Sequence, residues 1–459
     1  LFPVPCSLTG IPSEDPRVYD SICAADTIGV FQIESRAQMT MLPRLKPRCF
    51  YDLVIEVAIV RPGPIVGDMV HPYLRRRNGE EKVVYPDEKI ERVLGRTLGV
   101  PLFQEQAMSL AIVAAGFSPG EAEMLRRTIS AWKSRGKDAI PRYRRRFIDG
   151  MVGNGYERAF AEQCFERLKG FSEYGFPESH SASFALLVYA SAWLKCYYPA
   201  AFAAALINSQ PMGFYAPAQI IRDARDHGVE VRPIDVNRSE WDCTLEERRE
   251  VPKEHEVQEG RHEGPAIRLG MRMVKGLREA DARAIEQAVK RRGPFASIID
   301  LWRVSEVSAA SLYALALADA FGSIELDRQQ ALWAVQSLRG KPLPLFDAAA
   351  RASESQQRTA ALPPVAPPVQ VVRDYHAVGL ALKAHPLSFM RDALRRRRIL
   401  TAAQIRDERA CPHGRYASVA GLVLFRQRPG TAKGVLFMTL EDETGRADLI
   451  IRPRVYQQN

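Results

Sequence analysis

The most informative cluster of cationic side chains lies in residues 121–137, EAEMLRRTISAWKSRGK. Arg126 and Arg127 fall near the end of an amphipathic helical pattern, and Lys133, Arg135 and Lys137 follow in a loop. Arginine forks make bidentate bonds to phosphate oxygens, and several cations together offset the charge that develops in nucleotidyl transfer. The pattern predicts a clamp for a triphosphate, although a solvated basic helix face would show the same spacing.

A second candidate is a Gly- and aromatic-rich loop that leads into a very apolar helix within residues 170–199. His180 stands at the entrance of that helix, where backbone amides attract anions. Ser179 or Ser181 can cap the helix while His180 projects toward a ligand, and Tyr174 or Phe176 can stack on a base. A buried core helix behind a capped start is the structural alternative.

A third candidate is the stretch VRPGPIVGDMVHPYLRRRNG, residues 60–79. Its paired prolines restrict the backbone and place Arg61 rigidly at a bend, where we expect it to contact a nucleotide. Arg75 and Arg76 belong to a basic triplet suited to template-strand phosphates. A solvated charge run is the competing interpretation of that triplet.

Glycine turns before short helices form a fourth pattern. Lys275 and Gly276 precede a predicted helix, so that Gly276 lets a DNA backbone approach the exposed amides without any base being read. A second turn of this kind is expected at ADAFGS, with Gly322 near its end. Together they predict helix-hairpin-helix contacts to phosphates.

Near the C-terminus, apolar and polar residues alternate as in antiparallel strands. Phe425, Arg426, Arg428 and Phe437 are of the kinds that stack on and track a single nucleic-acid strand. Packing inside a small barrel would explain the two phenylalanines equally well.

Residues for a metal site are missing from the local sequence. Two-metal nucleotidyl transfer needs carboxylates, commonly an Asp-x-Asp on a strand, and the chain has no such motif. The sequence also lacks a phosphate-binding GxxxxGK[ST] loop and HExxH, and its seven cysteines form no CxxC pair. We therefore predict no catalytic residues and no metal ligands within this chain.

The elements that position these residues are mainly helical, with the clearest helices expected at 120–130, 157–169 and 181–197. A Pro- and Ala-rich stretch containing LPPVAPPVQ is typical of an extended linker, and YASVAGLVLFRQ begins an antiparallel strand pattern. We predict a large helical domain at 1–240, a polar connector at 241–263, a tandem helix-hairpin-helix region at 264–338, a linker at 339–372, a helical connector at 373–415, and a partial antiparallel β barrel of the oligonucleotide-binding (OB) type at 416–459.

Composition favours a soluble protein with a polyanionic partner. The 459 residues are 46% hydrophobic and 26% charged, and basic residues exceed acidic ones by 10. The longest nearly uncharged stretch is shorter than a membrane-spanning helix needs, and nothing resembles a signal peptide. We expect a cytoplasmic protein without a membrane partner.

These residues together resemble the bacterial C-family DNA polymerases, the DNA polymerase III alpha subunits, and specifically their error-prone, damage-inducible branch. The resemblance covers essentially the whole chain. Its strings are GVFQIESRAQM, RPGPI, PLFQEQAM, EMLRRT, GFPESHSASFALLVYASAWLKC, VRPIDVNRSEWDCTLE, GLALKAHPL and FRQRPGTAKGVLFMTLEDETG. The forms AWKSRGK and RQRPGTAKG are similar to the error-prone branch rather than to the main replicase.

The resemblance implies that residues 1–240 are the polymerase fingers and that the metal-binding aspartates belong to a preceding palm domain. Mg²⁺ would be held there, so this chain alone is expected to be inactive. Arg126 and Arg127 match the family's contacts to the incoming deoxynucleoside triphosphate, and primer-template DNA is the implied partner. The function implied is DNA-directed DNA synthesis across damaged template, in translesion synthesis and DNA repair.

Two points stay open at this stage. Residues 341–346, KPLPLF, carry Pro342 where the family's clamp-binding peptide has glutamine, which argues against direct binding to the sliding clamp. The resemblance implies recruitment to the clamp through a Y-family-like accessory protein and a RecA-like partner instead. The competing hypothesis is a non-catalytic DNA-binding or scaffold protein that retains these folds without a palm.

Overall fold

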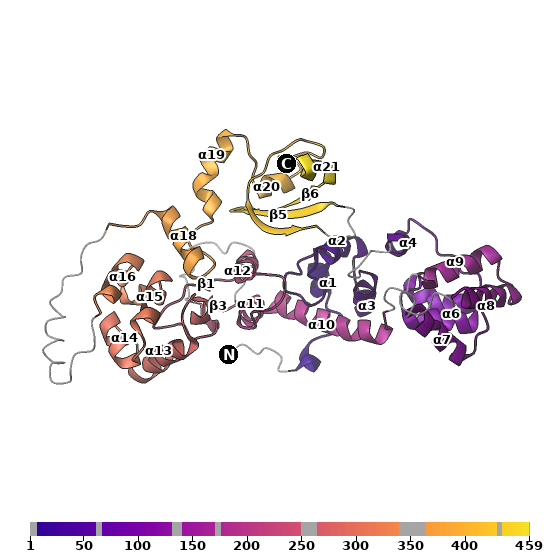
Figure 1. The fold of residues 1–459 in the computed structure, drawn as a ribbon, viewed down its shortest axis with the longest axis horizontal. Coiled ribbons are helices and arrows are strands. Elements are labelled where there is room, and N and C mark those ends of the chain that lie inside the picture. Colours follow the sequence, from indigo (N-terminus) through magenta and orange to yellow (C-terminus); the bar gives the residue numbers. More distant parts are fainter. Residues whose placement is uncertain are drawn as a thin grey trace. The chain divides into compact units, whose positions relative to one another are not determined.

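The computed structural model describes residues 7–60, 67–130, 140–169, 176–248, 264–338, 363–428 and 434–458. The chain divides into two compact units, Leu1–Tyr198 and Pro199–Asn459. Helices dominate both units, and the longer strands lie in the C-terminal part of the second (Figure 1). The predicted mainly helical fold with a short C-terminal antiparallel sheet is confirmed.

In the described part of the first unit the elements are η1 (Leu8–Gly10), α1 (Pro16–Cys23), α2 (Arg36–Leu45), α3 (Phe50–Ile59), α4 (Gly67–Arg77), α5 (Glu88–Leu94), η2 (Gly95–Thr97), α6 (Gln104–Val113), α7 (Pro119–Ser130), α8 (Ile140–Gly153), α9 (Arg158–Lys169) and α10 (Glu178–Tyr197). The three helices expected at 120–130, 157–169 and 181–197 are therefore confirmed as α7, α9 and α10.

Helix α10 is the centre of the first part of this unit, because it packs against both α3 and α1. The ring of Tyr189 on α10 lies 5.6 Å from that of Tyr19 on α1, and the Ser181 hydroxyl donates to the Val54 carbonyl on α3 over 2.7 Å. Helix α3 is buried from Asp52 to Ile59, as expected of a helix that is apolar on nearly all sides. Helices α5 to α9 share a separate apolar cluster that includes Phe147.

In the second unit the described elements are α11 (Pro199–Asn208), α12 (Pro217–Asp226), β1 (Val231–Arg232), β2 (Thr244–Glu246), β3 (Ala266–Arg268), η4 (Met271–Met273), α13 (Glu279–Arg292), α14 (Ile298–Ser305), α15 (Ala309–Leu317), η5 (Gly322–Ile324), α16 (Arg328–Gln336), α18 (Pro367–Ala377), η7 (Pro386–Met390), α19 (Arg391–Arg396), α20 (Ala402–Arg406), β4 (Leu422–Gln427), β5 (Leu436–Asp442), β6 (Gly445–Ile451) and α21 (Pro453–Gln458).

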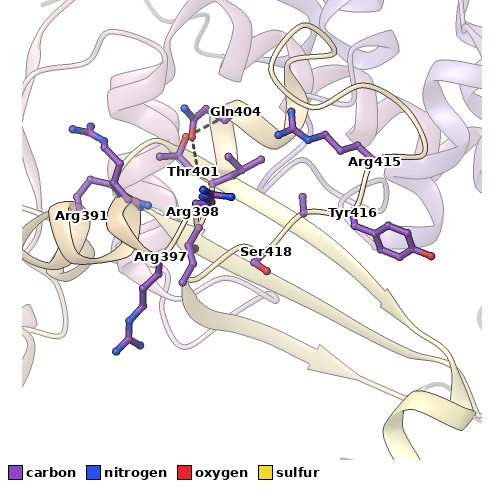
Figure 2. A pocket seen from close by; sticks show the side chains of 12 residues that line it. Arg391, Arg397, Arg398, Thr401, Gln404, Arg415, Tyr416 and Ser418 are labelled. Atoms are coloured by element: carbon purple, nitrogen blue, oxygen red, sulfur yellow. Dashed lines mark hydrogen bonds between the residues drawn. The ribbon is translucent and has the colours of Figure 1, made fainter.

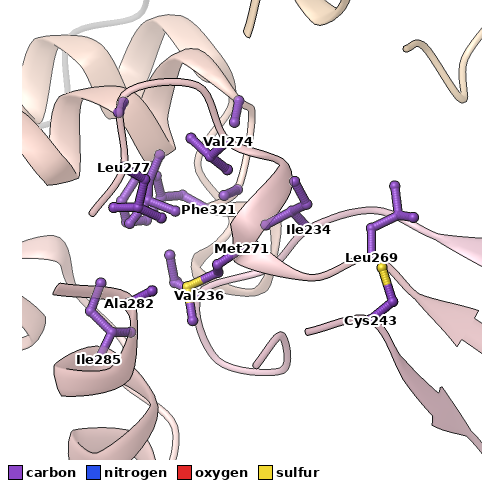
Figure 3. Packing of buried hydrophobic residues seen from close by; sticks show 14 of the residues in the cluster. Ile234, Val236, Cys243, Leu269, Met271, Val274, Leu277, Ala282, Ile285 and Phe321 are labelled. Atoms are coloured by element: carbon purple, nitrogen blue, oxygen red, sulfur yellow. The ribbon is translucent and has the colours of Figure 1, made fainter. Parts of the chain in front are cut away.

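The apolar core of this unit explains why the division of the chain precedes the expected boundary at residue 240. Ile207 of α11 and Ile220 of α12 belong to the same buried cluster as Met271, Ile285 and Phe321. Figure 3 shows part of that cluster, where side chains from the segments next to the small strands, such as Ile234 and Leu269, lie near those of α13, such as Ile285. Helices α11 and α12 therefore bury their apolar faces with the second unit.

Two further boundaries differ from those expected. The described part of the expected polar connector 241–263, residues 241–248, is not a simple connector, because β2 pairs with β3 in a sheet of order β1-β3-β2 and Glu246 forms an ion pair of 2.7 Å with Arg268. The expected linker 339–372 likewise ends early, since α18 begins at Pro367. Proline lacks an amide hydrogen that the first helical turn would leave unpaired, so it is well suited to that position.

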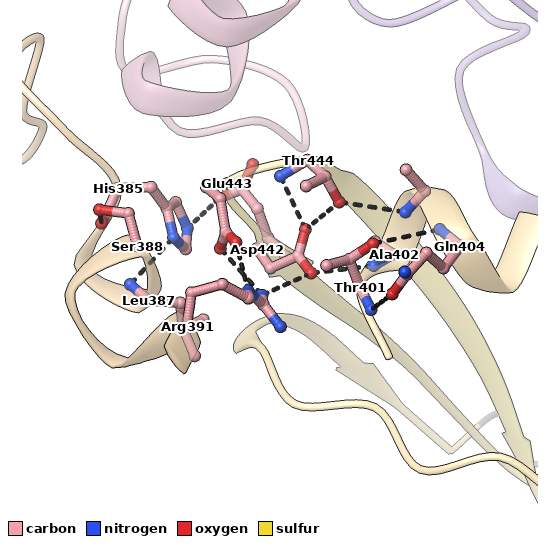
Figure 4. A network of polar contacts seen from close by, with 12 residues as sticks. His385, Leu387, Ser388, Arg391, Thr401, Ala402, Gln404, Asp442, Glu443 and Thr444 are labelled. Atoms are coloured by element: carbon pink, nitrogen blue, oxygen red, sulfur yellow. Dashed lines mark hydrogen bonds and ion pairs between the residues drawn. The ribbon is translucent and has the colours of Figure 1, made fainter. Parts of the chain in front are cut away.

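The C-terminal sheet is an antiparallel meander of order β4-β5-β6, with an irregularity between Val423 and Phe425. Asp442, at the end of β5, ties this sheet to the preceding helices (Figure 4). Its fully buried carboxylate accepts the Ala402 amide at 2.8 Å, the Thr444 hydroxyl at 2.7 Å and the Arg391 guanidinium at 3.0 Å. Asp442, Arg391 and Ala402 thus form a charged hub that joins the start of α19 and the start of α20 to the sheet. None of the helices that the structure describes combines the length and apolar composition needed to cross a bilayer.

Candidate functional site

Arg126 and Arg127 lie side by side near the end of α7, and one carboxylate holds both. Glu123 accepts hydrogen bonds from Arg126 Nε at 2.8 Å, Arg126 Nη2 at 2.7 Å and Arg127 Nε at 2.8 Å. The bonds from Arg126 and then Arg127 lower the pKa of Glu123 to about 2, so the carboxylate is ionised at neutral pH. Arg127 is exposed and Arg126 is half-buried. The pair is therefore oriented before any ligand arrives, and Glu123 was not singled out from the sequence.

The start of α6 connects this pair with His180. The Arg126 Nη1 atom lies 3.5 Å from the Gln104 side-chain oxygen, and the Gln104 amide donates to the Phe176 carbonyl over 3.1 Å. Phe176 then lies against His180, with 5.2 Å between the ring centroids. The structure thus brings the predicted arginine and histidine into one neighbourhood through residues far apart in the sequence.

His180 is an exposed ring in an aromatic layer on the first turn of α10. Its centroid lies 4.2 Å from that of Phe184, which in turn meets Phe31 edge-on at 5.2 Å. The expected cap by Ser179 or Ser181 is wrong: Pro177 occupies the N-cap position without a side-chain bond, and the Ser181 hydroxyl bonds to α3 instead. Ser181 does not cap α10, because its side chain is fully buried against α3 and its hydroxyl is bonded there.

The basic triplet on α4 is largely tied to the protein. Arg75 and Arg76 both pair with Glu81, at 2.9 and 2.8 Å, and Arg76 also donates to the Leu98 carbonyl. Arg77 forms a two-armed ion pair with Asp52. Arg75 keeps about half of its side chain exposed, at 49%, whereas Arg76 keeps 14%. Of the two predicted phosphate contacts, Arg75 is the accessible one.

Three of the predicted nucleotide contacts, Arg61, Lys133 and Tyr174, lie outside the described residues.

In the second unit, the Lys275–Gly276 turn presents an open backbone before α13. Gly276 has a φ of +83° and an added Cβ would meet no atom within 4 Å, so a strand can approach it closely. The Lys275 amide donates to the Ala377 carbonyl at 2.9 Å and its ammonium to the Tyr375 carbonyl at 3.2 Å. Both acceptors are neutral, so the ammonium charge is not cancelled.

The turn at Gly322 differs, because a protein carboxylate already occupies it. Buried Asp235 accepts the Ser323 amide at 2.9 Å, and Asn237 bonds to the Ser323 hydroxyl at the same distance. The amide after Gly322 is therefore not available for a phosphate. Sequence periodicity could not reveal this, since Asp235 lies more than eighty positions earlier in the chain.

The predicted residues of the C-terminal sheet divide between its two faces. Phe425 pairs with Thr439 and Phe437 with Gln427, so the two phenylalanines are diagonal neighbours on one face. Arg426 lies on the opposite face, where its guanidinium and that of Arg428 lie 5.8 and 5.4 Å from the ring of Tyr456. The aromatic and basic residues predicted to contact a strand therefore lie on different faces of the sheet, because strand side chains alternate between faces.

Comparison with known proteins adds a family context to this geometry. Residues 4–155 match the family described as "Bacterial DNA polymerase III alpha subunit finger domain", and residues 228–331 match "Helix-hairpin-helix motif". Over 458 residues the chain is 56% identical to "Error-prone DNA polymerase 2" of Rhizobium meliloti (strain 1021), covering 98% of this chain and 41% of that protein.

Two further relatives are also named error-prone DNA polymerases and match nearly the whole of this chain. "Error-prone DNA polymerase" of Sinorhizobium medicae (strain WSM419) is 56% identical, with 96% of this chain and 40% of that protein covered. "Error-prone DNA polymerase 1" of Agrobacterium fabrum (strain C58 / ATCC 33970) is 55% identical, with 98% and 41% covered. The chain therefore spans about 40% of the length of the curated relatives it matches.

Proposed function

Because the chain belongs to the error-prone branch of the bacterial DNA polymerase III alpha-subunit family, we propose that it supplies the fingers and a DNA-binding portion of an error-prone DNA-directed DNA polymerase. The observation that carries this proposal is the oriented pair Arg126 and Arg127 within the matched finger region. The longer protein would add deoxynucleotides to a primer end opposite damaged template.

The arginine pair would bind the triphosphate of the incoming deoxynucleotide. Each guanidinium offers a planar fork to phosphate oxygens, and Glu123 holds the two forks close together. A bound triphosphate would compete with Glu123 for the same donors, so exchange between carboxylate and phosphate needs little reorganisation of the arginines. The aromatic layer around His180 would lie beside the nascent base pair.

Polymerases of this kind use a divalent metal, and we propose Mg²⁺. The described carboxylates near Arg126 do not fit such a site. Glu123 is bonded by both arginines, and Glu105 accepts the Glu178 amide at 3.0 Å. Mg²⁺ would instead be held by carboxylates of the longer protein that lie outside this chain.

Duplex DNA would contact the second unit at the Lys275–Gly276 turn, where a cation and an open backbone precede α13. Phe425 and Phe437 would contact an unpaired strand on one face of the C-terminal sheet. Recruitment to a sliding clamp through a Y-family-like accessory protein and a RecA-like partner remains part of the proposal, and the KPLPLF segment lies outside the described residues.

The test is a gel-shift assay of the 459-residue chain with primer-template DNA, run beside primer extension with Mg²⁺. We expect DNA binding that weakens steeply between about 50 and about 200 mM salt, because phosphate contacts dominate it, and no extension. A salt-independent interaction would contradict both DNA contacts. Extension by the isolated chain would contradict the assignment of the metal site to other parts of the protein.

Neutralising the arginine pair should weaken triphosphate binding. For Arg126→Gln with Arg127→Gln, the affinity for a fluorescent deoxyadenosine triphosphate analogue should fall by about tenfold or more for each guanidinium removed. The matched control is Arg92→Gln with Arg158→Gln, which removes two exposed arginines that, among the described residues of this unit, form ion pairs with Glu88 and Glu162. Equal affinities of the two double variants would exclude the pair from the nucleotide site.

A further inference from the structure

A groove of about 700 Å³ lies in the second unit between the end of α19 and the segment before β4 (Figure 2). One wall is formed by residues 391–404 and the other by residues 415–418. The Leu400 amide donates to the Ser418 carbonyl over 2.8 Å and joins the two walls. The groove is therefore a property of one compact unit, and its volume falls within the range of ligand-binding pockets.

The groove has a rigid frame on the side of residues 391–404. Thr401 and Gln404 form a reciprocal capping box at the start of α20. Arg391 bonds to Asp442 and Glu443, while Asp442 also accepts the Ala402 amide (Figure 4). The hub anchors the wall to the turn between β5 and β6. The backbone of this wall near Arg391 and Ala402 is consequently held in place before a ligand binds.

The lining of the groove is strongly cationic. It contains five arginines and no carboxylate; they are Arg391, Arg395, Arg397, Arg398 and Arg415. Arg391 is neutralised by the hub, and Arg395 makes a loose, exposed ion pair of 3.7 Å with Asp392. In the part of the chain that the structure describes, Arg397, Arg398 and Arg415 form no ion pair, and Arg415 donates to the neutral Ala410 carbonyl.

The groove also offers groups that suit a nucleotide chain rather than a bare anion. Tyr416 is fully exposed beside Arg415, and Figure 2 shows its ring standing away from the wall. Thr401 and Ser418, which carry hydroxyl groups, also line the groove. Positively charged grooves with aromatic platforms are the means by which proteins hold single strands without reading their sequence.

We propose that this groove binds the sugar-phosphate backbone of single-stranded nucleic acid, with Arg397, Arg398 and Arg415 on phosphates and Tyr416 stacked on a base. The proposal rests on the proposed function, in which the strand would be unpaired template. None of the residues that line the groove belongs to β4, β5 or β6, so its lining does not include Phe425 or Phe437.

The test measures binding of a short fluorescein-labelled oligothymidylate to the full chain by fluorescence anisotropy. For Arg397→Gln with Arg398→Gln we expect an affinity loss of about tenfold or more, and a salt slope lower by about 1.4 because each single-strand phosphate contact contributes about 0.7. Tyr416→Ala should weaken binding by about fivefold or more, whereas Tyr416→Phe should not. The control Arg92→Gln with Arg158→Gln removes the same charge in the other unit.

Two outcomes would overturn the proposal. Equal losses of oligothymidylate affinity in the groove and control variants would mean that binding depends on net charge alone and not on the groove. Displacement of the oligonucleotide by inorganic tripolyphosphate at equal phosphate concentration, with no effect of Tyr416→Ala, would make the groove a site for free polyphosphate. Because triphosphate binding at Arg126 and Arg127 is measured separately, failure of the groove and failure of the polymerase assignment can be told apart.

Discussion

Replacing Glu56 by glutamine is expected to stabilise the first unit by about 3 kcal/mol at pH 7. Glu56 is fully buried in the middle of α3, and neither of its carboxylate oxygens has a hydrogen-bond partner in the described structure. Burial raises the pKa of Glu56 to about 8 from its ordinary value of 4.5. The folded protein therefore carries a neutral carboxyl group where the unfolded chain carries a charged one.

The sign of the pH dependence follows from that difference. Below the unfolded pKa of 4.5 both states are protonated, so Glu56 costs the fold little more than glutamine does. As pH rises toward 8 the unfolded state loses the proton first, and stability falls by about 1.4 kcal/mol for each pH unit. The advantage of Glu56→Gln should therefore be small near pH 5 and largest at or above pH 8.

Urea unfolding of both proteins at about pH 5 and about pH 8 measures this effect. Glu80→Gln is the matched control, because Glu80 is exposed in the same unit and its side chain has no hydrogen bond or ion pair to the described residues. The control should change stability by less than about 0.5 kcal/mol at either pH. An advantage for Glu56→Gln that does not grow with pH would show that Glu56 is not buried in this way.

Replacing Asp442 by asparagine should destabilise the second unit by about 3 kcal/mol at pH 7. Its carboxylate accepts the amides of Ala402 and Thr444, the Thr444 hydroxyl and the Arg391 guanidinium. An asparagine side chain would turn an amide NH₂ group toward some of these donors. It would also leave the buried Arg391 with less compensating charge.

Acid should reduce the difference between the wild-type chain and Asp442→Asn. Burial acts to raise the pKa of Asp442, but the bonds from Thr444 and from the Ala402 amide, with the Arg391 charge, outweigh it and lower the pKa. A depressed folded pKa gives stability that is present above the ordinary value of 3.8 and is lost as pH falls through the folded pKa. The wild-type chain thus loses this contribution in acid, whereas the variant never had it.

Urea unfolding at pH 7 and at successively lower pH tests the hub, with Glu408→Gln as control. Glu408 is exposed in the same unit, and no bond from its side chain reaches the described residues. Oligothymidylate binding adds an independent readout, because the hub supports the wall of the groove: Asp442→Asn should bind more weakly than Glu408→Gln while still folded. Unchanged stability at pH 7 would contradict a buried, four-bonded carboxylate.

Much of the fold followed from local pattern. Period and composition predicted α7, α9 and α10 and the antiparallel strands near the C-terminus, because amphipathic spacing reports which face of an element is buried. The predicted boundaries were wrong where the same residue type suits two different local structures. The prolines at 367 and 368 suit an extended linker or the first turn of a helix, and Glu246 suits a solvated loop or an ion pair with Arg268.

The sequence by itself determined the helical fold class, the family and which residues carry positive charge. Only the tertiary structure decided which of those charges and turns are available to a ligand. Glu123 orients Arg126 and Arg127, Asp235 fills the turn at Gly322, and the walls of the arginine groove meet at Leu400 and Ser418. The physical reason is that long polar side chains are satisfied by whichever partner the packed chain brings within hydrogen-bond distance, often from distant positions.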